Sequence, residues 1–410
     1  MILERSVEAG FSGRPLETYR AKRQCIGRQL STSTQAYSLF GSAKDSKCPV
    51  ARLVNGGRPA EAFIEEGQAL STEDGRRFEA NEYNYAPFTA PSYQSRYKMT
   101  MGLQPLNPTE WVEIDEYYEE EMALRRDIIR DKRDIVIASQ PEAADANREL
   151  LDMLAEFLPK RFPDRFSRVN NLLVNHSTKE EWDLSDTSLD PLEVSALLVQ
   201  EDLCLMKVDE AGVLRFVSGA VLFPQRWSLL QKLGMDMHRI HEPVPLYAGE
   251  IQRPVDGFMM RLSEGKPFWR ANWTITDNPV LFQPLEEDVI LRAVGGDNVN
   301  LDWMADQGPV TKENAGLRLS TRCERETLSR FPKSRAILFT IRTHLRNLDH
   351  YAQHPERAFE LARALRNLHP DVKRYKTIAA FESQALEFLD DVAEKNRAVV
   401  PEPEPVTSIH

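Results

Sequence analysis

His241 is the residue whose position most strongly suggests chemistry. It lies two residues before Pro243, and a helix cannot continue through that proline. An imidazole on such a stiff stretch of backbone suits an axial ligand of a metal or a haem, because the ring must be held in one orientation. His238 would share its face if this stretch is helical. The alternative interpretation, a turn residue or a buried imidazole with a structural partner, is the commoner one.

Arg270 and Asn272 form a second candidate site. On a strand these two side chains point to one face, whereas Ala271 and Trp273 point to the other. An arginine and an asparagine that converge on a pocket can bind a carboxylate, a propionate or bound oxygen. The alternative is an edge strand with an exposed polar face and Trp273 in the core.

A third segment, residues 322–328, carries dense alternating charge near the end of a strand. Glu324 or Glu326 could lie in a polar pocket and hold a cationic amine or relay a proton. A surface covered with ion pairs is the simpler interpretation. Four further histidines show no metal-ligand spacing and are interpreted as structural, namely His344, His350, His354 and His369.

Several common motifs are absent from the sequence. It contains no P-loop, no dinucleotide-binding glycine motif after a strand, no G-x-S-x-G and no H-E-x-x-H. The four cysteines form no C-x-x-C pair, so zinc-finger, thioredoxin and cysteine-ligated iron–sulfur sites lack support. If the protein carries out redox chemistry, its electrons therefore come from another protein.

Composition excludes other classes of protein. The 410 residues are 41% hydrophobic and 28% charged, which is typical of a globular protein and excludes disorder throughout. A net charge of −11 argues against a nucleic-acid surface. No apolar run approaches the roughly 20 residues of a transmembrane segment. Residues 1–60 are basic, with ten Lys and Arg against four Asp and Glu, and are expected to be a disordered or targeting extension.

The elements that would position these residues alternate between helical and extended patterns. A cap at Asn107 before Pro108 predicts a helix start, and apolar spacing predicts a second helix that Pro159 and Pro163 close. Glycine at position 212 marks a hairpin turn. Strands are expected at 203–208, 213–223, 268–275, 317–324 and 336–343, and helices at 227–233, 355–368 and 381–392. The pattern predicts an α+β protein with one large core over 82–395 and a flexible tail at 396–410.

These segments, in this order, resemble the haem-dependent oxidative N-demethylase alpha-subunit-like family, which has many fungal members. The resemblance covers roughly residues 82–380. It rests on Met101-Gly102-Leu103, Trp111, Asp115, Glu201-Asp202-Leu203-Cys204, Lys232-Leu233-Gly234, Ile240-His241-x-Pro243-Val244-Pro245, Arg270-x-Asn272-Trp273, Glu324-Arg325-Glu326-Thr327-Leu328, Pro332-x-Ser334 and Ala336-Ile337-x-Phe339-x-Ile341-x-Thr343. Glu326 departs from the pattern, because the family often has glutamine there.

The resemblance implies a haem-binding PAS-like domain, in which a small secondary amine is oxidised by dioxygen. Electrons would come from NADPH through a separate flavin and iron–sulfur reductase. Carried over by motif, His241 is expected as the proximal iron ligand, with Lys232 and Trp273 also on the cofactor. Arg270 and Asn272 are expected on the oxygen, substrate or propionate side, and Glu324 at the substrate ammonium.

Two alternatives to an enzyme stay open, a haem-based PAS-like sensor or carrier and a binding scaffold that has lost haem. The flanks contain no helix-turn-helix, kinase or cyclase signature that would serve as an output module, which favours the enzyme. An intracellular, cytoplasmic location is expected, and a mitochondrial one is the alternative.

Overall fold

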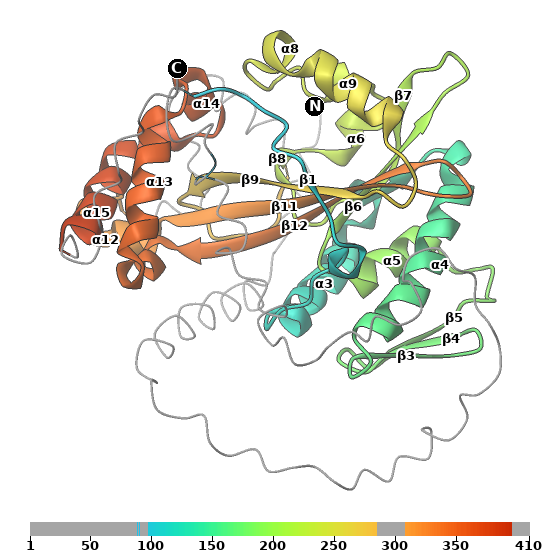
Figure 1. Ribbon diagram of the computed structural model, residues 1–410. Helices are drawn as coiled ribbons and strands as arrows, with labels where there is room; N and C mark the ends of the chain where they lie inside the picture. Colours follow the sequence, from blue (N-terminus) through green and yellow to red (C-terminus); the bar gives the residue numbers. More distant parts are fainter. Residues whose placement is uncertain (1–87, 89, 91–96, 285–307, 396–410) are drawn as a thin grey trace, which may run out of the picture. The chain divides into compact units, whose positions relative to one another are not determined.

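An antiparallel sheet of seven strands is the centre of the structure, a computed structural model that describes residues 88, 90, 97–284 and 308–395 (Figure 1). The predicted extension at 1–60 and the predicted tail at 396–410 lie outside the described residues. In sheet order the strands are β1 (Gln104–Pro105), β9 (Phe268–Thr276), β11 (Ser320–Arg330), β12 (Ile337–Asn347), β6 (Asp202–Val208), β7 (Leu214–Ala220) and β2 (Ile137–Ser139). Helices accompany the sheet, so the α+β class is confirmed.

Two hairpins build most of this sheet. The β11–β12 hairpin is closed by a hydrogen bond from the Phe331 amide to the Ala336 carbonyl (2.8 Å). The β6–β7 hairpin turns at Asp209, whose carboxylate accepts the amides of Ala211 and Val213, each at 2.9 Å. Gly212 has φ +79° in this turn, a conformation that glycine adopts without strain. The hairpin predicted from the apolar runs on either side of Gly212 is therefore confirmed.

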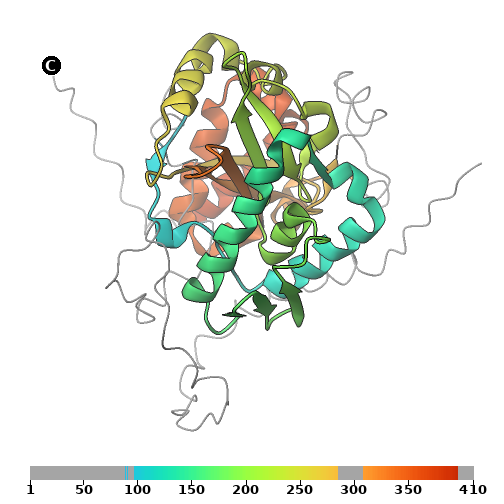
Figure 2. The same ribbon diagram turned by 90° about the vertical axis from the view of Figure 1, so that its right-hand side faces the viewer.

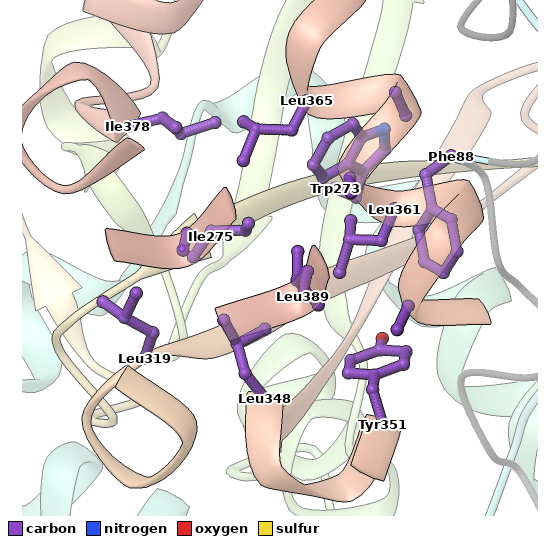
Figure 3. Packing of buried hydrophobic residues seen from close by; sticks show 14 of the residues in the cluster. Phe88, Trp273, Ile275, Leu319, Leu348, Tyr351, Leu361, Leu365, Ile378 and Leu389 are labelled. Carbon is purple, nitrogen blue, oxygen red and sulfur yellow. The ribbon is translucent and has the colours of Figure 1, made fainter. Parts of the chain in front are cut away.

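Four C-terminal helices cover one face of β9 and β11 (Figure 3). They are α12 (Lys312–Arg318), α13 (Pro355–Asn367), α14 (Pro370–Tyr375) and α15 (Glu382–Lys395). Trp273 and Ile275 of β9 lie among their leucines, and the Phe88 ring meets Trp273 edge-on at a centroid distance of 6.0 Å. The strand expected at 317–324 begins only at Ser320, because Lys312–Arg318 form a helix with a Thr311 capping box.

Three α-helices and a small antiparallel sheet precede β6, and Figure 2 shows this sheet in green. They are α3 (Tyr118–Val136), α4 (Ala144–Arg161) and α5 (Pro191–Leu198), and the small sheet comprises β3 (Phe166–Val169), β4 (Leu172–Asn175) and β5 (Glu180–Asp183). Asn107 does cap a helix, but only the single 3-10 turn η4 (Pro108–Glu110). Pro163 follows the end of α4 as predicted, whereas Pro159 lies inside the last turn of α4, where a proline removes only one backbone hydrogen bond.

A helical segment connects β7 to β9. It begins with β8 (Gln225–Trp227), which pairs in parallel with β10 (Gln283–Pro284). Four short helices follow, namely α6 (Leu229–Lys232), α7 (Met237–Ile240), α8 (Tyr247–Glu250) and α9 (Gln252–Arg261). Their apolar side chains pack on β6, β7, β11 and β12 in a cluster separate from that of the C-terminal helices. The remaining 3-10 turns are η5 (Pro141–Ala143), η6 (Leu348–Gln353) and η7 (Ile378–Ala380).

A buried cluster of ions lies on the sheet face that carries Arg325 and Arg342. The Arg342 guanidinium donates to Asp115 (2.6 Å) and to Glu121 (2.9 Å). Arg325 donates to the carbonyls of Glu110 and Trp111. These contacts fasten the segment before α3 to the sheet. We call this set the ionic cluster, with members Glu113, Asp115, Glu121, Gln200, Glu201, Arg325, Arg342 and His344.

Candidate functional site

Antiparallel pairing places two acidic and two polar side chains on the other face of β9 and β11. Arg270 lies opposite Glu326, and Asn272 lies opposite Glu324. Arg270 Nη1 donates to Glu326 Oε2 at 2.8 Å, and Asn272 Nδ2 donates to Glu324 Oε2 at 3.3 Å. The prediction that Arg270 and Asn272 share a face is confirmed. That face also brings them to the two carboxylates of the third sequence segment.

His241 ends α7, as the prolines that follow it predict. The Asp236 carboxylate caps the amino end of this short helix by accepting the Arg239 amide (2.9 Å). At the other end, the His241 amide donates to the carbonyls of Met237 (3.3 Å) and His238 (3.2 Å). The imidazole Nδ1 also lies 2.8 Å from the Met237 carbonyl oxygen. Since a carbonyl only accepts, Nδ1 carries the proton and Nε2 carries the lone pair.

One side of the imidazole is covered by an aromatic ring. Tyr247 stacks on His241 with a centroid distance of 4.4 Å and an interplanar angle of 14°. The loop between them returns through Leu246, a non-glycine residue with φ 70°. Tyr247 is buried, with 3% of its surface exposed. The stacking and the Nδ1 bond together leave the ring little freedom to rotate.

The pKa of His241 is lowered to about 4, first by burial and then by the positive charges of Lys232 and Arg270, against the opposing bond to Met237. The imidazole is therefore neutral at physiological pH. A neutral ring with a protonated Nδ1 presents Nε2 as an electron-pair donor, which is the state in which histidine binds a metal.

Lys232 lies next to this histidine. Its ammonium donates to the Ile240 carbonyl at 3.1 Å and sits 5.0 Å from the centroid of the Trp227 ring. Burial lowers the pKa of Lys232. The contact between an ammonium and the last carbonyls of a helix is favourable, because those carbonyls lack intrahelical partners.

The two carboxylates occupy different environments. Glu324 Oε1 accepts from the buried guanidinium of Arg322 (3.1 Å), and its Oε2 accepts from Asn272. Glu326 pairs with Arg270, and burial raises the pKa of Glu326 despite that positive charge. Each carboxylate retains further lone pairs, since an ionised carboxylate accepts about four hydrogen bonds.

Lys376 is a site residue that the sequence analysis missed. It follows α14 and donates to Asn272 Oδ1 at 2.8 Å and to the Trp273 carbonyl. Burial lowers its pKa to about 8, although Glu324 opposes the shift. The bond to Asn272 fixes the amide with its nitrogen toward Glu324. Tyr247 was also missed, and no signal in the single sequence distinguishes Lys376 or Tyr247 from ordinary surface or core residues. Arg322 lies in the charged segment 322–328 that the sequence analysis singled out, although it was not itself named as a site residue.

Other predicted residues lie elsewhere. Trp273 is on the opposite sheet face from Arg270 and Asn272, with 1% exposure inside the C-terminal helix core, so the structure does not bring it to His241 (Figure 3). His238 is exposed on α7. His344 is buried in β12 beside Glu113 at 3.3 Å.

Partly buried apolar side chains pack on the core cluster beside the segment that carries Lys232 and His241. They come from β8, the residue after α6, α7, α9, β9 and β12. The ring of Phe258 meets that of Phe268 edge-on at 5.1 Å. The set comprises Trp227, Leu233, Met237, Ile240, Val255, Phe258, Phe268 and Phe339. A half-covered apolar wall next to a neutral histidine suits a flat, mostly apolar ligand.

The donor set fits a haem. A single imidazole from the protein is enough to hold haem iron, because the porphyrin itself provides the nitrogen ligands that a bare metal ion would need from side chains. No group of three or more ligating side chains within the described ranges could hold a bare metal ion. On the site face three cations, Arg270, Arg322 and Lys376, accompany two carboxylates, Glu324 and Glu326. This excess of positive charge suits a ligand that carries an anionic group.

Fold and site together define an α+β protein with a histidine-centred, cationic and apolar site on an antiparallel sheet. The chain belongs to the haem-dependent oxidative N-demethylase, alpha subunit-like family, whose sequence model matches residues 102–386. The resemblance inferred from the motifs is thereby confirmed, and the family's name implies companion subunits. Within the described part of the chain, no helix combines the length and the apolar character of a membrane span.

Proposed function

We propose that this protein is the haem-binding subunit of an oxidative N-demethylase that acts on a small amine. The observation that carries the proposal is the neutral His241, whose Nδ1–H is bonded to the Met237 carbonyl and whose Nε2 offers its electron pair to a metal. A bound haem would supply dioxygen activation. The overall reaction converts an N-methyl amine, dioxygen, two electrons and two protons into the demethylated amine, formaldehyde and water. The electrons would come from NADPH through a separate flavin and iron–sulfur reductase.

The chain's own residues would bind and orient the reactants. His241 would hold the iron, and Arg270 would face a propionate or the oxygen side, because its guanidinium is partly exposed while it holds Glu326. Glu324 would accept a hydrogen bond from the substrate ammonium, and Asn272 would fix that carboxylate. The apolar wall around Phe258 and Phe268 would exclude water from the methyl group.

We also propose that the sheet is PAS-like. The five longest strands of the sheet support this, namely β6, β7, β9, β11 and β12 in chain order. Across the sheet these strands lie in the order β9, β11, β12, β6, β7. The first strand in the chain, β6, therefore pairs with the last, β12, in the middle of the sheet. The short helices α6 to α9 lie between the second and the third of these strands, next to the proposed haem ligand His241.

A spectroscopic comparison of two histidine variants tests the haem site. We expect the wild-type protein, purified from haem-supplemented cells, to show a Soret band that shifts on dithionite reduction and on addition of carbon monoxide. His241→Ala should lose the band, with the fold intact by circular dichroism. His238→Ala is the matched control, because His238 lies on the same short helix but is exposed, and it should keep the band.

The same spectra separate an enzyme from a sensor. Small N-methyl amines should perturb the Soret band of the wild-type protein, and formaldehyde should form when an electron donor is supplied. A haem protein that responds to carbon monoxide but to no amine would favour the sensor. A colourless protein that fails to take up added haemin would refute the haem site.

A further inference from the structure

We infer that Lys232 is a positioning residue for His241, which acts by holding the carboxyl end of α7 and not by binding the carboxylates of the cofactor. The inference rests on the proposed function, because it concerns the histidine proposed to hold the iron. It assigns Lys232 a task different from direct contact with haem. Three features of the structure support it.

The first feature is a fixed platform under Lys232. The connection from α6 to α7 is fastened to β7, because the Gly234 amide donates to the Phe216 carbonyl (2.7 Å) and the Phe216 amide donates to the Met235 carbonyl (3.0 Å). Gly234 has φ +81° there, so the chain reverses direction directly after α6. Lys232 is thus placed beside the turn that carries His241.

The second feature is the bond from Lys232 Nζ to the Ile240 carbonyl. This carbonyl belongs to the peptide group that joins Ile240 to His241. A helix of one turn has little intrinsic stability, because nucleation is unfavourable. Its geometry therefore depends on further contacts, among them the Asp236 cap at one end and the Lys232 bond at the other.

The third feature is that the imidazole reaches back to the start of the same turn. His241 Nδ1 bonds to the carbonyl of Met237, the first residue of α7. Any rotation of the Ile240–His241 peptide would change the distance between that nitrogen and that oxygen. Lys232 therefore controls the direction of Nε2 indirectly. Its bond to the Ile240 carbonyl fixes the Ile240–His241 peptide, and the Nδ1 bond to Met237 then fixes the ring, as outer residues do behind metal-bound histidines.

Backbone hydrogen exchange in the haem-free protein tests the positioning role. Lys232→Met keeps an apolar stem against Trp227 but removes the ammonium. We expect the exchange of the His241 amide to accelerate about 10- to 100-fold, the factor that corresponds to the loss of one hydrogen bond from a charged group. Arg239→Met is the matched control, since Arg239 is an exposed cation on α7, and it should leave that exchange unchanged. Unchanged exchange in Lys232→Met would overturn the inference.

Two porphyrins then separate positioning from contact with the cofactor carboxylates. The affinities of wild type and Lys232→Met are measured for haemin and for haemin dimethyl ester, whose carboxylates are blocked. We expect Lys232→Met to weaken both by the same factor, about 10- to 100-fold, and Lys232→Arg to restore much of the loss. A loss confined to haemin would show that Lys232 binds the carboxylates and would refute the inference.

Failure of the Lys232 inference can be told apart from failure of the proposed function. If the wild-type protein takes up neither porphyrin, the proposed function is refuted. The exchange of the His241 amide in the haem-free variants still decides whether Lys232 holds α7.

Discussion

Replacing Glu201 with glutamine should remove a pH-dependent instability from the ionic cluster. Glu201 is 1% exposed. Its Oε1 accepts the Glu113 amide (2.9 Å), and its Oε2 lacks a hydrogen-bond partner among the described residues. Burial raises the pKa of Glu201 to about 7 against the nearby Arg342 charge. Glutamine keeps an oxygen for the Glu113 amide and has no charge to bury.

The magnitude follows from the shift in pKa. The ordinary value is 4.5, so the folded state retains a proton that the unfolded state has released between pH 4.5 and about 7. The unfolded state therefore binds fewer protons in this window, and the stability falls as the pH rises through it. At about 1.4 kcal/mol for each pH unit, a shift of roughly 2.5 units removes up to about 3 kcal/mol by pH 8.

Urea denaturation at pH 4.5 and pH 8 measures this effect. We expect Glu201→Gln to match the wild type at pH 4.5 and to exceed it by up to about 3 kcal/mol at pH 8. Glu210→Gln is the control, because Glu210 is exposed in the β6–β7 turn, and its stability should follow the wild type at both values. An equal pH slope in wild type and Glu201→Gln would refute the assignment of the buried proton to this residue.

Two further predictions concern packing and the second titrating group. Gly316→Ala places a Cβ 2.7 Å from Phe388 Cε2, so we expect α12 to be pushed away from α15 and the free energy of unfolding to fall by about 1 kcal/mol, despite the better helix propensity of alanine. Gly249→Ala is the control, because open space surrounds its Cβ, and it should raise the free energy of unfolding slightly. Thermal denaturation of the two variants and the wild type compares these effects. Burial lowers the pKa of Lys376 to about 8 from an ordinary 10.5, so between pH 8 and pH 10.5 the unfolded state binds more protons than the folded state. The free energy of unfolding of the wild type should therefore rise with pH in this window. Lys376→Met should abolish that rise in urea denaturation at pH 8 and pH 10, and a rise that persists would exclude Lys376 as its source.

Local sequence patterns predicted the elements and the shared faces. The two-residue period of a strand was enough to put Arg270 and Asn272 on one face and Trp273 on the other, and Pro243 was enough to end α7 at His241. The family was also identified from motif order alone. Helix boundaries were less certain, because Asn107 and Pro108 cap a single turn that tertiary contacts do not extend.

Contacts between distant segments could not be predicted from a single sequence. Lys376 meets Asn272 across about a hundred residues, and Lys232 meets Ile240 only because Gly234 reverses the chain. Nor does alternation tell which face of a strand becomes the site. Trp273 was expected at the cofactor, yet its face is covered by α13 and α15, since a large apolar ring gains most when it is fully buried.

The two faces of β11 and β12 show how one sheet separates structure from chemistry. On the face with Arg325 and Arg342, the guanidinium groups donate to carbonyls or carboxylates of the segment before α3, and these contacts close the face to water. On the face with Glu324 and Glu326, partly buried apolar side chains and an excess of cations border a neutral histidine. Uncompensated positive charge is costly to bury unless an anion joins it. The surplus on that face is therefore best understood as the counterpart of an anionic ligand, and removal of the Arg270 guanidinium should weaken a haem with free carboxylates more than a haem ester.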